Sequence, residues 1–248
     1  MQRVYLPVIL LLAVSAIAQA QTSGLAESYL NRGNSFFAHR YLDQALADYD
    51  IAIKFNPRWA RAYHNRGVAR HAKGDLDGAM ADFDTAIEID PSYALAYCSR
   101  SNVLYARGDL DQAIEGYNRA IAINPRLADA YCNRGAARKA RGDLDGAIAD
   151  YNQSLRINPR LTDAYNNRGN ALTTRGRLQE AISDFDKAIN IDVLNAAAYA
   201  NRGYALLLQG KTAEAEKDFE RCLKLDPKFK SLVQRMTGSS LPGLGRRP

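Results

Sequence analysis

The sequence predicts an all-α solenoid of six tandem helix–turn–helix repeats, and two periodic features carry this prediction. The tripeptide Asn-Arg-Gly recurs at steps of 34 residues, with one double step where Ser99-Arg100-Ser101 fills the slot, at Asn31, Asn65, Asn133, Asn167 and Asn201. Prolines follow the same period at Pro57, Pro91, Pro125, Pro159 and Pro227, and Val193 occupies the remaining slot. A fixed period of this length is typical of solenoids, in which stacked repeats share one continuous core.

The repeats are numbered 1 to 6 and span residues 26–59, 60–93, 94–127, 128–161, 162–195 and 196–229. The first helix of each repeat carries a tyrosine in its first turn, at Tyr29, Tyr63, Tyr97, Tyr131, Tyr165 and Tyr199. A turn then follows at Gly74-Asp75, Gly108-Asp109 and Gly142-Asp143, and more loosely at Gly176-Arg177 and Gly210-Lys211. Glycine suits the left-handed residue that ends a helix, and aspartate suits the start of the next helix.

The second helix of each repeat has one apolar face. The first residue of this apolar face is an alanine, at Ala45, Ala79, Ala113, Ala147, Ala181 and Ala215. Four residues later comes an aromatic residue, at Tyr49, Phe83, Tyr117, Tyr151, Phe185 and Phe219. Three residues further on comes a small residue, at Ala52, Ala86, Ala120, Ser154, Ala188 and Cys222. Steps of four and three residues place these side chains on the same side of a helix.

Glycine recurs in the middle of the first helix, at Gly33, Gly67, Gly135, Gly169 and Gly203. Glycine in a helix interior costs about 1 kcal/mol relative to alanine, so a packing reason is expected. We expect the second helix to press against it and to meet it with the alanine that begins the apolar face. The proline is expected to end the second helix and to set the angle into the next repeat.

This pattern resembles the tetratricopeptide repeat family, with aromatic, Gly, Ala, aromatic, Ala and Pro at fixed offsets over Ala26–Phe229. The resemblance implies a right-handed α-solenoid that acts as a protein-interaction scaffold, with its first helices lining a concave surface. The chain departs from the family pattern in two ways. Arginine replaces the usual leucine of the first helix throughout, and Ser101 replaces the glycine of repeat 3.

The first twenty residues have the three parts of a secretory signal peptide. A basic start at Met1-Gln2-Arg3 precedes a mostly apolar run from Val4 to Ala18, and Ala18-Gln19-Ala20 is a small-x-small cleavage site. The apolar run is shorter than the roughly 20 residues that a membrane-spanning helix needs. We therefore expect cleavage after Ala20, a periplasmic or secreted protein, and no stable membrane anchor.

Composition argues against a nucleic-acid partner. The net charge is +6, but acidic residues are interspersed with the basic ones throughout the chain, whereas nucleic-acid binding needs a concentrated basic patch. Three cysteines, Cys98, Cys132 and Cys222, are an odd number with no CxxC spacing, so buried thiols are expected rather than a redox site. After the repeats, Lys228–Met236 has helical spacing and is expected to cap repeat 6, and residues 237–248 are expected to be disordered.

No known catalytic motif appears in the sequence. There is no nucleophile elbow, P-loop, HExxH or CxxC pair. The residues outside the repeats, 21–25 and 230–248, are too few for a catalytic domain. We expect a protein that is not an enzyme and has no cofactor. His64, His71 and Cys98 lack a metal-ligand spacing, so no metal site is expected.

The candidate binding residues are asparagines of the first helices, here called the Asn ladder: Asn31, Asn65, Asn133, Asn167 and Asn201, with Ser99 in the repeat 3 slot. A second row, one turn further on, comprises Asn34, Asn102 and Asn170. A carboxamide offers a donor and an acceptor, which match the C=O and N–H of an extended peptide. The alternative is that these side chains satisfy local groups of the protein, or that the ladder reflects duplication alone.

The arginines that follow the ladder, here called the Arg row, are expected to be structural: Arg32, Arg66, Arg100, Arg134, Arg168 and Arg202. Aspartates recur at matching positions of the second helices, at Asp48, Asp82, Asp150, Asp184 and Asp218. Half-buried ion pairs are therefore predicted. In repeat 3, Gly116 replaces the aspartate, which leaves Glu115 or an aspartate of another repeat for Arg100. The alternative is a basic stripe that binds an acidic partner.

Together these features predict an exported scaffold that binds a peptide or helical segment of a partner protein. Two other functions stay open at this point. One is a structural module that assembles with copies of itself, and the other is an accessory subunit of an envelope-assembly or enzyme complex. The sequence does not indicate the oligomeric state.

Overall fold

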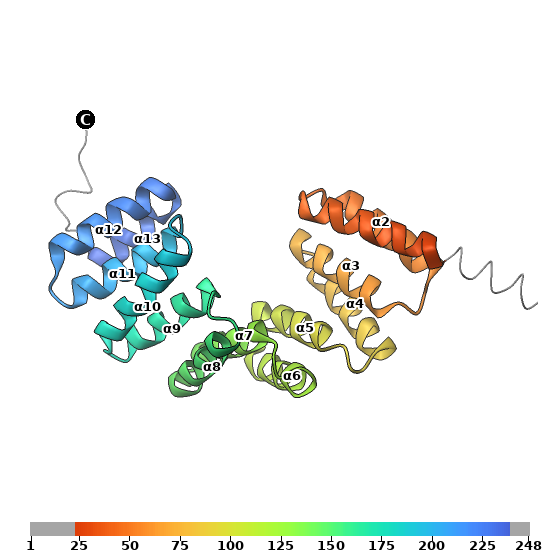
Figure 1. The fold of residues 1–248 in the computed structure, drawn as a ribbon, viewed down its shortest axis with the longest axis horizontal. Helices are drawn as coiled ribbons and strands as arrows, with labels where there is room; N and C mark the ends of the chain where they lie inside the picture. The colour runs from red at the N-terminus through yellow and green to blue at the C-terminus, as the bar shows by residue number, and fades with distance from the viewer. Residues whose placement is uncertain (1–22, 239–248) are drawn as a thin grey trace, which may run out of the picture. The chain divides into compact units, whose positions relative to one another are not determined.

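The computed structural model describes residues 23–238, which form pairs of helices joined by short turns (Figure 1). The helices are residues 23–38, α2 (Leu42–Phe55), α3 (Ala60–Lys73), α4 (Leu76–Ile89), α5 (Ala94–Arg107), α6 (Leu110–Ile123), α7 (Ala128–Ala140), α8 (Leu144–Ile157), α9 (Thr162–Thr174), α10 (Leu178–Ile191), α11 (Ala196–Leu208), α12 (Thr212–Leu225), the 3-10 helix η1 (Pro227–Phe229) and α13 (Lys230–Thr237). Residues 23–238 contain no β-strand. The all-α prediction and the helix pair in each repeat are confirmed.

The chain divides into an N-terminal unit that ends at Ile123 and a C-terminal unit that begins at Asn124. The N-terminal unit holds repeats 1 to 3, and the C-terminal unit holds repeats 4 to 6. Within a unit, the two helices of each repeat pack against each other, and first helices of neighbouring repeats also touch, as α7 and α9 do. One side of each unit is thus lined by first helices, where the candidate binding residues lie.

A buried aromatic ring forms the centre of each repeat. Tyr49, Phe83, Tyr117, Tyr151, Phe185 and Phe219 are at most 1% exposed. A Cβ atom added at the first-helix glycine of five repeats would lie 2.6 to 2.9 Å from that ring. The second helix presses against the glycine as expected, but the nearest atoms are those of the ring; the alanine contributes a backbone oxygen, which lies 3.3 Å from the added Cβ for Ala45 in repeat 1 and 3.2 Å for Ala215 in repeat 6. The glycine makes room for the aromatic ring, because only a residue without a side chain fits there.

Repeat 3 solves the same packing problem by an exchange of two residues. Ser101 replaces the first-helix glycine, is 1% exposed, and donates a hydrogen bond to the Tyr97 carbonyl oxygen at 2.8 Å. Gly116 replaces the second-helix aspartate, and a Cβ atom there would collide with Ser101 Oγ. The Ser101 side chain of α5 thus fits because residue 116 of α6 has no side chain.

The turn within each repeat has the predicted left-handed residue. Gly74, Gly108, Gly142, Gly176 and Gly210 have φ between +75° and +93°. In repeat 1 this position is Arg40, whose φ is +65°. Asp75 and Asp143 cap the following helices by accepting hydrogen bonds from the N–H of Gly78 and Gly146, both at 2.9 Å.

Proline follows the end of the second helix in five repeats, but it is not required to end that helix. The residue that precedes the proline slot is Asn or Asp in all six repeats, and its side chain accepts a hydrogen bond from the N–H two residues later at 2.9 to 3.4 Å: Asn56, Asp90, Asn124, Asn158, Asp192 and Asp226. Helix α10 ends at Ile191 in the same way, although Val193 stands in the proline slot. The Asx turn is the common feature, because it offers the backbone an alternative to another helical hydrogen bond.

The last repeat is followed by η1 and α13. Val233 of α13 is 1% exposed and packs in the core cluster that contains Phe219 and Cys222. The predicted signal peptide and residues 239–248 lie outside the described residues. None of the helices within residues 23–238 has the length and apolar character required to cross a membrane.

Candidate functional site

The Arg row forms the predicted ion pairs. In five repeats the arginine donates two or more hydrogen bonds, at 2.6 to 3.2 Å, to the aspartate of the second helix: Arg32–Asp48, Arg66–Asp82, Arg134–Asp150, Arg168–Asp184 and Arg202–Asp218. The aspartates are buried, with 2% to 6% exposure. The same five guanidinium groups lie 4.9 to 5.7 Å from the ring centres of the first-turn tyrosines. The Arg row is therefore structural in these repeats.

The same arginines also join neighbouring repeats. A second hydrogen bond of 2.6 Å runs to a residue of the preceding repeat, from Arg66 to Asp50, from Arg168 to Asn152 and from Arg202 to Asp186. Hydrogen bonding to Asp184 raises the pKa of Arg168 above its usual value, and hydrogen bonding to Asp218 does so for Arg202. Arg100 has no aspartate at the matching position of its own repeat, where Gly116 stands, and donates Nε–H to Asp84 of the preceding repeat at 2.6 Å. This is one of the two partners that the sequence left open.

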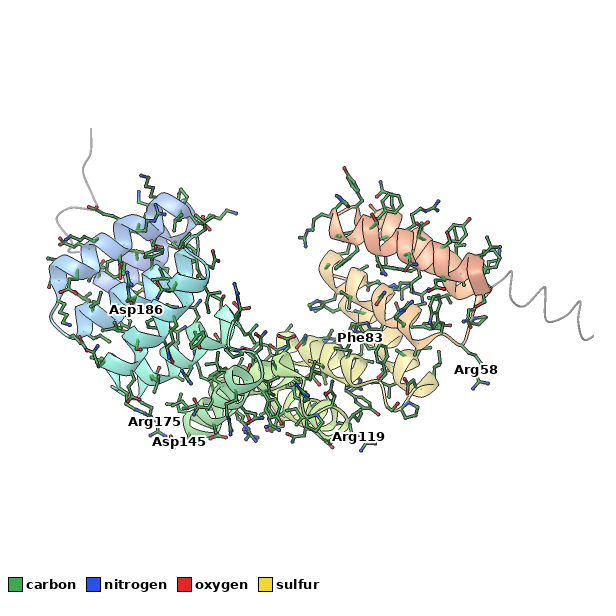
Figure 2. The ribbon with its side chains drawn as sticks, in the orientation of Figure 1. Arg58, Phe83, Arg119, Asp145, Arg175 and Asp186 are labelled. Carbon is green, nitrogen blue, oxygen red and sulfur yellow. The ribbon has the colours of Figure 1, made fainter. Side chains whose placement is uncertain are left out.

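Further ion pairs join the repeats near the turns. Lys73 contacts Asp43 at 2.5 Å, and Arg107 contacts Asp77. In the C-terminal unit Arg175 contacts Asp145, and both side chains are labelled in Figure 2. Each pair connects the end of one first helix to the start of the second helix of the preceding repeat. These pairs are exposed, so each adds little stability.

In the N-terminal unit, Asn65 and Ser99 of the Asn ladder bond to Asn34 of the second row and to His64. Asn34 Oδ1 accepts hydrogen bonds from Tyr49 Oη at 2.9 Å and from Asn65 Nδ2 at 2.8 Å. His64 lies between the next members, with Nδ1 3.2 Å from Asn65 Oδ1 and Nε2 3.0 Å from Ser99 Oγ. Burial lowers the pKa of His64, although the hydrogen bond to Asn65 opposes the shift. These polar groups therefore satisfy one another.

Two more predicted residues of this unit differ in their surroundings. Asn102 Oδ1 accepts a hydrogen bond from Tyr117 Oη at 2.7 Å, as Asn34 does from Tyr49. Asn31 is exposed and makes no hydrogen bond with any residue of the described range. Asn102 therefore has a hydrogen-bond partner, and Asn31 is exposed to solvent, so neither side chain is both buried and without a partner.

The C-terminal unit is different. Asn133 is half-buried, and Asn167 Nδ2 lies 3.8 Å from Cys132 Sγ. The side chains of Asn170 and Asn201 are half-buried and make no hydrogen bond with other residues in 23–238. Asn166 is 8% exposed, and its Oδ1 has no hydrogen-bond partner in the described part of the chain. We call Asn166, Asn170 and Asn201 the Asn166 cluster.

The repeat geometry brings the Asn166 cluster together. Asn166 and Asn170 are four residues apart in α9 and so share one face of that helix. Asn201 stands 35 residues after Asn166, the spacing that joins His64 to Ser99. It also stands 31 residues after Asn170, the spacing that joins Asn34 to Asn65. The cluster thus places three carboxamides at the junction of repeats 5 and 6.

A missing hydroxyl explains why Asn170 lacks a partner. Asn34 and Asn102 each receive a hydrogen bond from a tyrosine fifteen residues later, and the residue at that spacing from Asn170 is Phe185. Sequence reasoning did not select Asn166. The available signal was a carboxamide at a position that holds Leu30, His64, Cys98, Cys132 and Ala200 in the other repeats.

Cys132 and Cys222 are buried thiols of low acidity. Burial raises the pKa of Cys132 and of Cys222 to about 11, so both thiols stay protonated near neutral pH. No group of three or more His, Cys, Asp or Glu side chains within residues 23–238 is arranged to hold a metal ion.

Sequence comparison assigns the repeats to a family. A family model described as TPR repeat matches residues 67–106, 101–140, 137–174 and 169–210, and one described as Tetratricopeptide repeat matches residues 196–229. These segments cover well over half of the 248 residues. The chain belongs to the tetratricopeptide repeat family. No curated protein matches this tetratricopeptide repeat chain over its sequence.

Solved structures support the same fold. The protein described as Pseudomonas aeruginosa pilF is 16% identical, with a TM-score of 0.77 over 89% of this chain and 100% of the other. The APC/C hetero-tetramer Cut9-Hcn1 is 15% identical, with a TM-score of 0.80 over 86% of this chain. This chain spans 42% of the Cut9-Hcn1 chain that it matches. YrrB, described as a TPR protein with an unusual peptide-binding site, is 22% identical, with a TM-score of 0.58 over 77% of this chain and 98% of its own.

The family and the fold are those of a protein-interaction scaffold. The tetratricopeptide repeats of this chain place their aromatic rings and ion pairs between helices, where they hold the fold together. The side of each unit that is lined by first helices carries the polar groups that are not required for packing. Within it, the Asn166 cluster has the hydrogen-bonding capacity that the protein itself leaves unused.

Proposed function

We propose that this protein binds an extended peptide segment of a partner protein at the Asn166 cluster. The observation that carries the proposal is the buried Oδ1 atom of Asn166, which has no hydrogen-bond partner among residues 23–238. Buried polar atoms without a partner are rare in native proteins, and each requires an explanation. A ligand N–H donor that reaches this oxygen supplies one.

The chemistry of the cluster suits a peptide backbone. Each carboxamide of Asn166, Asn170 and Asn201 offers an acceptor oxygen and a donor nitrogen, as a peptide group does. A neutral hydrogen bond contributes about 0.5 to 1.5 kcal/mol, and relief of an unsatisfied buried acceptor contributes about 1 to 3 kcal/mol. After the cost of ordering a peptide, these contributions correspond to micromolar or weaker binding. Side chains around the cluster then select the sequence.

The comparisons favour a peptide ligand in general terms. YrrB is described as having an unusual peptide-binding site, and Cut9-Hcn1 is described as part of a hetero-tetramer. At 22% and 15% identity these proteins share the fold, and their ligands do not transfer to this chain. They support the view that the tetratricopeptide scaffold of this protein binds protein segments.

The test begins with selection of peptides on the full-length protein from a random 12-residue phage library, followed by fluorescence anisotropy with the selected peptide. Asn170→Ala combined with Asn201→Ala should weaken binding about tenfold, the loss of one to two hydrogen bonds. Asn31→Ala is the matched control and should bind as the wild type does. Equal affinities for all three proteins, with unchanged circular dichroism, would refute the proposal.

We also infer that residues 1–20 direct export and are removed after Ala20, so that binding takes place in the periplasm or outside the cell. The support is the signal pattern in the sequence. Mass spectrometry of the protein recovered from cell fractions tests this inference. A mature chain that begins at Gln21 in the exported fraction is expected, and an uncleaved chain confined to the cytoplasm would contradict it.

A further inference from the structure

We propose that repeat 3 contains a carboxylate-binding site at Arg100, whose counterparts in the other five repeats bind an aspartate side chain. The site is separate from the Asn166 cluster and does not depend on the peptide binding proposed above. Its centre is Gly116 of α6, which occupies the position of Asp48, Asp82, Asp150, Asp184 and Asp218.

In the other five repeats the aspartate at this position binds the arginine of the Arg row. Its carboxylate receives hydrogen bonds from Nε and Nη2 of that arginine, as in the pair Arg168–Asp184 at 2.7 and 2.6 Å. Guanidinium and carboxylate match each other as two parallel hydrogen bonds, which makes this a geometrically specific pair. The repeat therefore builds a carboxylate-binding arrangement five times.

Repeat 3 keeps the arginine and lacks the carboxylate. Arg100 bonds through Nε to Asp84, and its Nη1 and Nη2 atoms make no hydrogen bond or ion pair with any residue between 23 and 238. The Arg100 side chain is 35% exposed, compared with 14% to 23% for the arginines of repeats 2, 4, 5 and 6. Donor groups that are satisfied in the other repeats are thus accessible here.

The space around these donors is open. A cleft of about 320 Å³ lies at this position, lined by Tyr97, Arg100, Gln112, Glu115, Gly116 and Arg119. Arg119, labelled on α6 in Figure 2, makes no hydrogen bond or ion pair within the described residues. The cleft lining carries the guanidinium groups of Arg100 and Arg119 and the carboxylate of Glu115. Asp84 of the preceding repeat already pairs with Nε of Arg100, so a carboxylate ligand would bind its Nη1 and Nη2 groups.

The exchange of Ser101 and Gly116 keeps the site open. Any side chain at position 116 would collide with Ser101 Oγ, and Ser101 is held by its hydrogen bond to the Tyr97 carbonyl. A side chain at position 116 therefore requires Ser101 to move or to change as well. The same pair of residues provides the variant that closes it. Ser101→Gly with Gly116→Asp restores the pattern of the other five repeats.

The experiment follows the Nε–Hε signal of Arg100 and the amide signal of Gly116 by NMR in the full-length protein at constant ionic strength. The probes are N-acetyl-Ala-Ala, which has only a C-terminal carboxylate, N-acetyl-Ala-Asp-Ala-amide, which has only a side-chain carboxylate, and N-acetyl-Ala-Asn-Ala-amide, which has none. At least one carboxylate probe should shift both signals with half-saturation on the order of 1 to 10 mM, as expected for a small ligand held by one bidentate contact. The asparagine probe should shift neither.

Two variants make the result decisive. Ser101→Gly with Gly116→Asp should abolish the shift of Arg100, because its own carboxylate then occupies the site. Arg100→Lys should weaken binding roughly tenfold at the Gly116 amide, since lysine cannot form the bidentate pair. The C-terminal and side-chain probes identify which kind of carboxylate the site prefers. Absence of any shift up to about 50 mM, five times the upper half-saturation value expected from ligand size, would overturn the proposal. So would equal shifts in wild type and double variant.

Discussion

Two neighbouring aspartates of α10 allow a direct test of which ion pairs hold the repeats together. Asp184 has a side chain that is 4% exposed and accepts two hydrogen bonds from Arg168 of its own repeat, at 2.7 and 2.6 Å. Asp186 has a side chain that is 47% exposed and accepts one hydrogen bond from Arg202 of the next repeat, at 2.6 Å. Each is changed to asparagine, so the two variants have the same net charge and nearly the same volume.

The expected costs differ because the environments differ. Removal of one partner from a buried ion pair costs about 3 to 5 kcal/mol. An asparagine side chain in place of Asp184 can still accept one hydrogen bond through its amide oxygen, so we expect Asp184→Asn to lower the free energy of unfolding by about 2 to 3 kcal/mol. Solvent screens the exposed pair, and Asp186→Asn should cost less than about 1 kcal/mol.

Urea denaturation followed by circular dichroism is the appropriate assay, because guanidinium chloride would screen the ion pairs. With a slope of about 2 kcal/mol per molar urea, Asp184→Asn should lower the midpoint by about 1 M. A double-mutant cycle with Arg168→Gln should give a coupling energy for Asp184 and Arg168 that exceeds about 1 kcal/mol. Equal costs for the two aspartates, within about 0.5 kcal/mol, would refute the distinction between buried and exposed pairs.

Gly169→Ala should lower the stability by about 1 kcal/mol, since overpacking against the buried Phe185 ring, 2.6 Å from the new Cβ, outweighs the gain in helix propensity; urea midpoints measure this, and a stabilised variant would contradict it. Burial lowers the pKa of His64, so the unfolded chain takes up a proton at higher pH than the folded protein, and stability should fall as the pH drops below about 6.5, by up to about 1.4 kcal/mol per pH unit until the folded pKa is reached. His64→Gln should remove this part of the pH dependence in denaturation curves at pH 7.5 and 5.5. The same loss of stability between these two pH values in wild type and variant would exclude the effect. Val193→Pro should raise the stability by about 0.4 to 1 kcal/mol, because the turn already has the shape that proline fixes in the other repeats and the Val193 N–H makes no hydrogen bond in the described chain; a lower thermal midpoint would count against it.

The fold could be predicted from the sequence because every repeat has the same spacing of aromatic and small residues. The register of Tyr131, Gly135, Ala147 and Tyr151 identifies two helices and the faces that they bury. The pairing of Arg134 with Asp150 also follows, because two antiparallel helices joined by a short turn bring positions sixteen residues apart to the same level. These are local consequences of helix periodicity.

Features that depend on contacts between particular side chains were not predictable in the same way. The sequence predicted that proline ends the second helix. In repeat 5 the helix ends at the same place with Val193 in the proline slot, where the Asp192 side chain accepts a hydrogen bond from the backbone. The arginine bonds to the preceding repeat, such as Arg202 to Asp186, require the packing of two repeats and have no signature in one helix.

The candidate binding residues illustrate the same limit. The members of the second row, Asn34, Asn102 and Asn170, look equivalent in sequence, but whether their side chains are free to bind a ligand depends on a neighbour in another helix. Asn34 has Tyr49 as a partner, whereas Asn170 stands opposite Phe185, which has no hydroxyl group. The difference was present in the sequence as tyrosine against phenylalanine. It gained meaning only when the structure placed the hydroxyl beside the carboxamide.

The bonds between consecutive repeats also bear on how such a chain can change in length. Repeat 5 presents an acceptor, Asp186, to the next repeat and an arginine, Arg168, to the previous one. A second copy of residues 162–195 placed after residue 195 would have Asp186 as the acceptor for its arginine and would offer its own aspartate to Arg202. The junction made by duplication is therefore chemically the same as the junction it interrupts. This hydrogen bond therefore places no obstacle to the gain of an internal 34-residue segment by duplication.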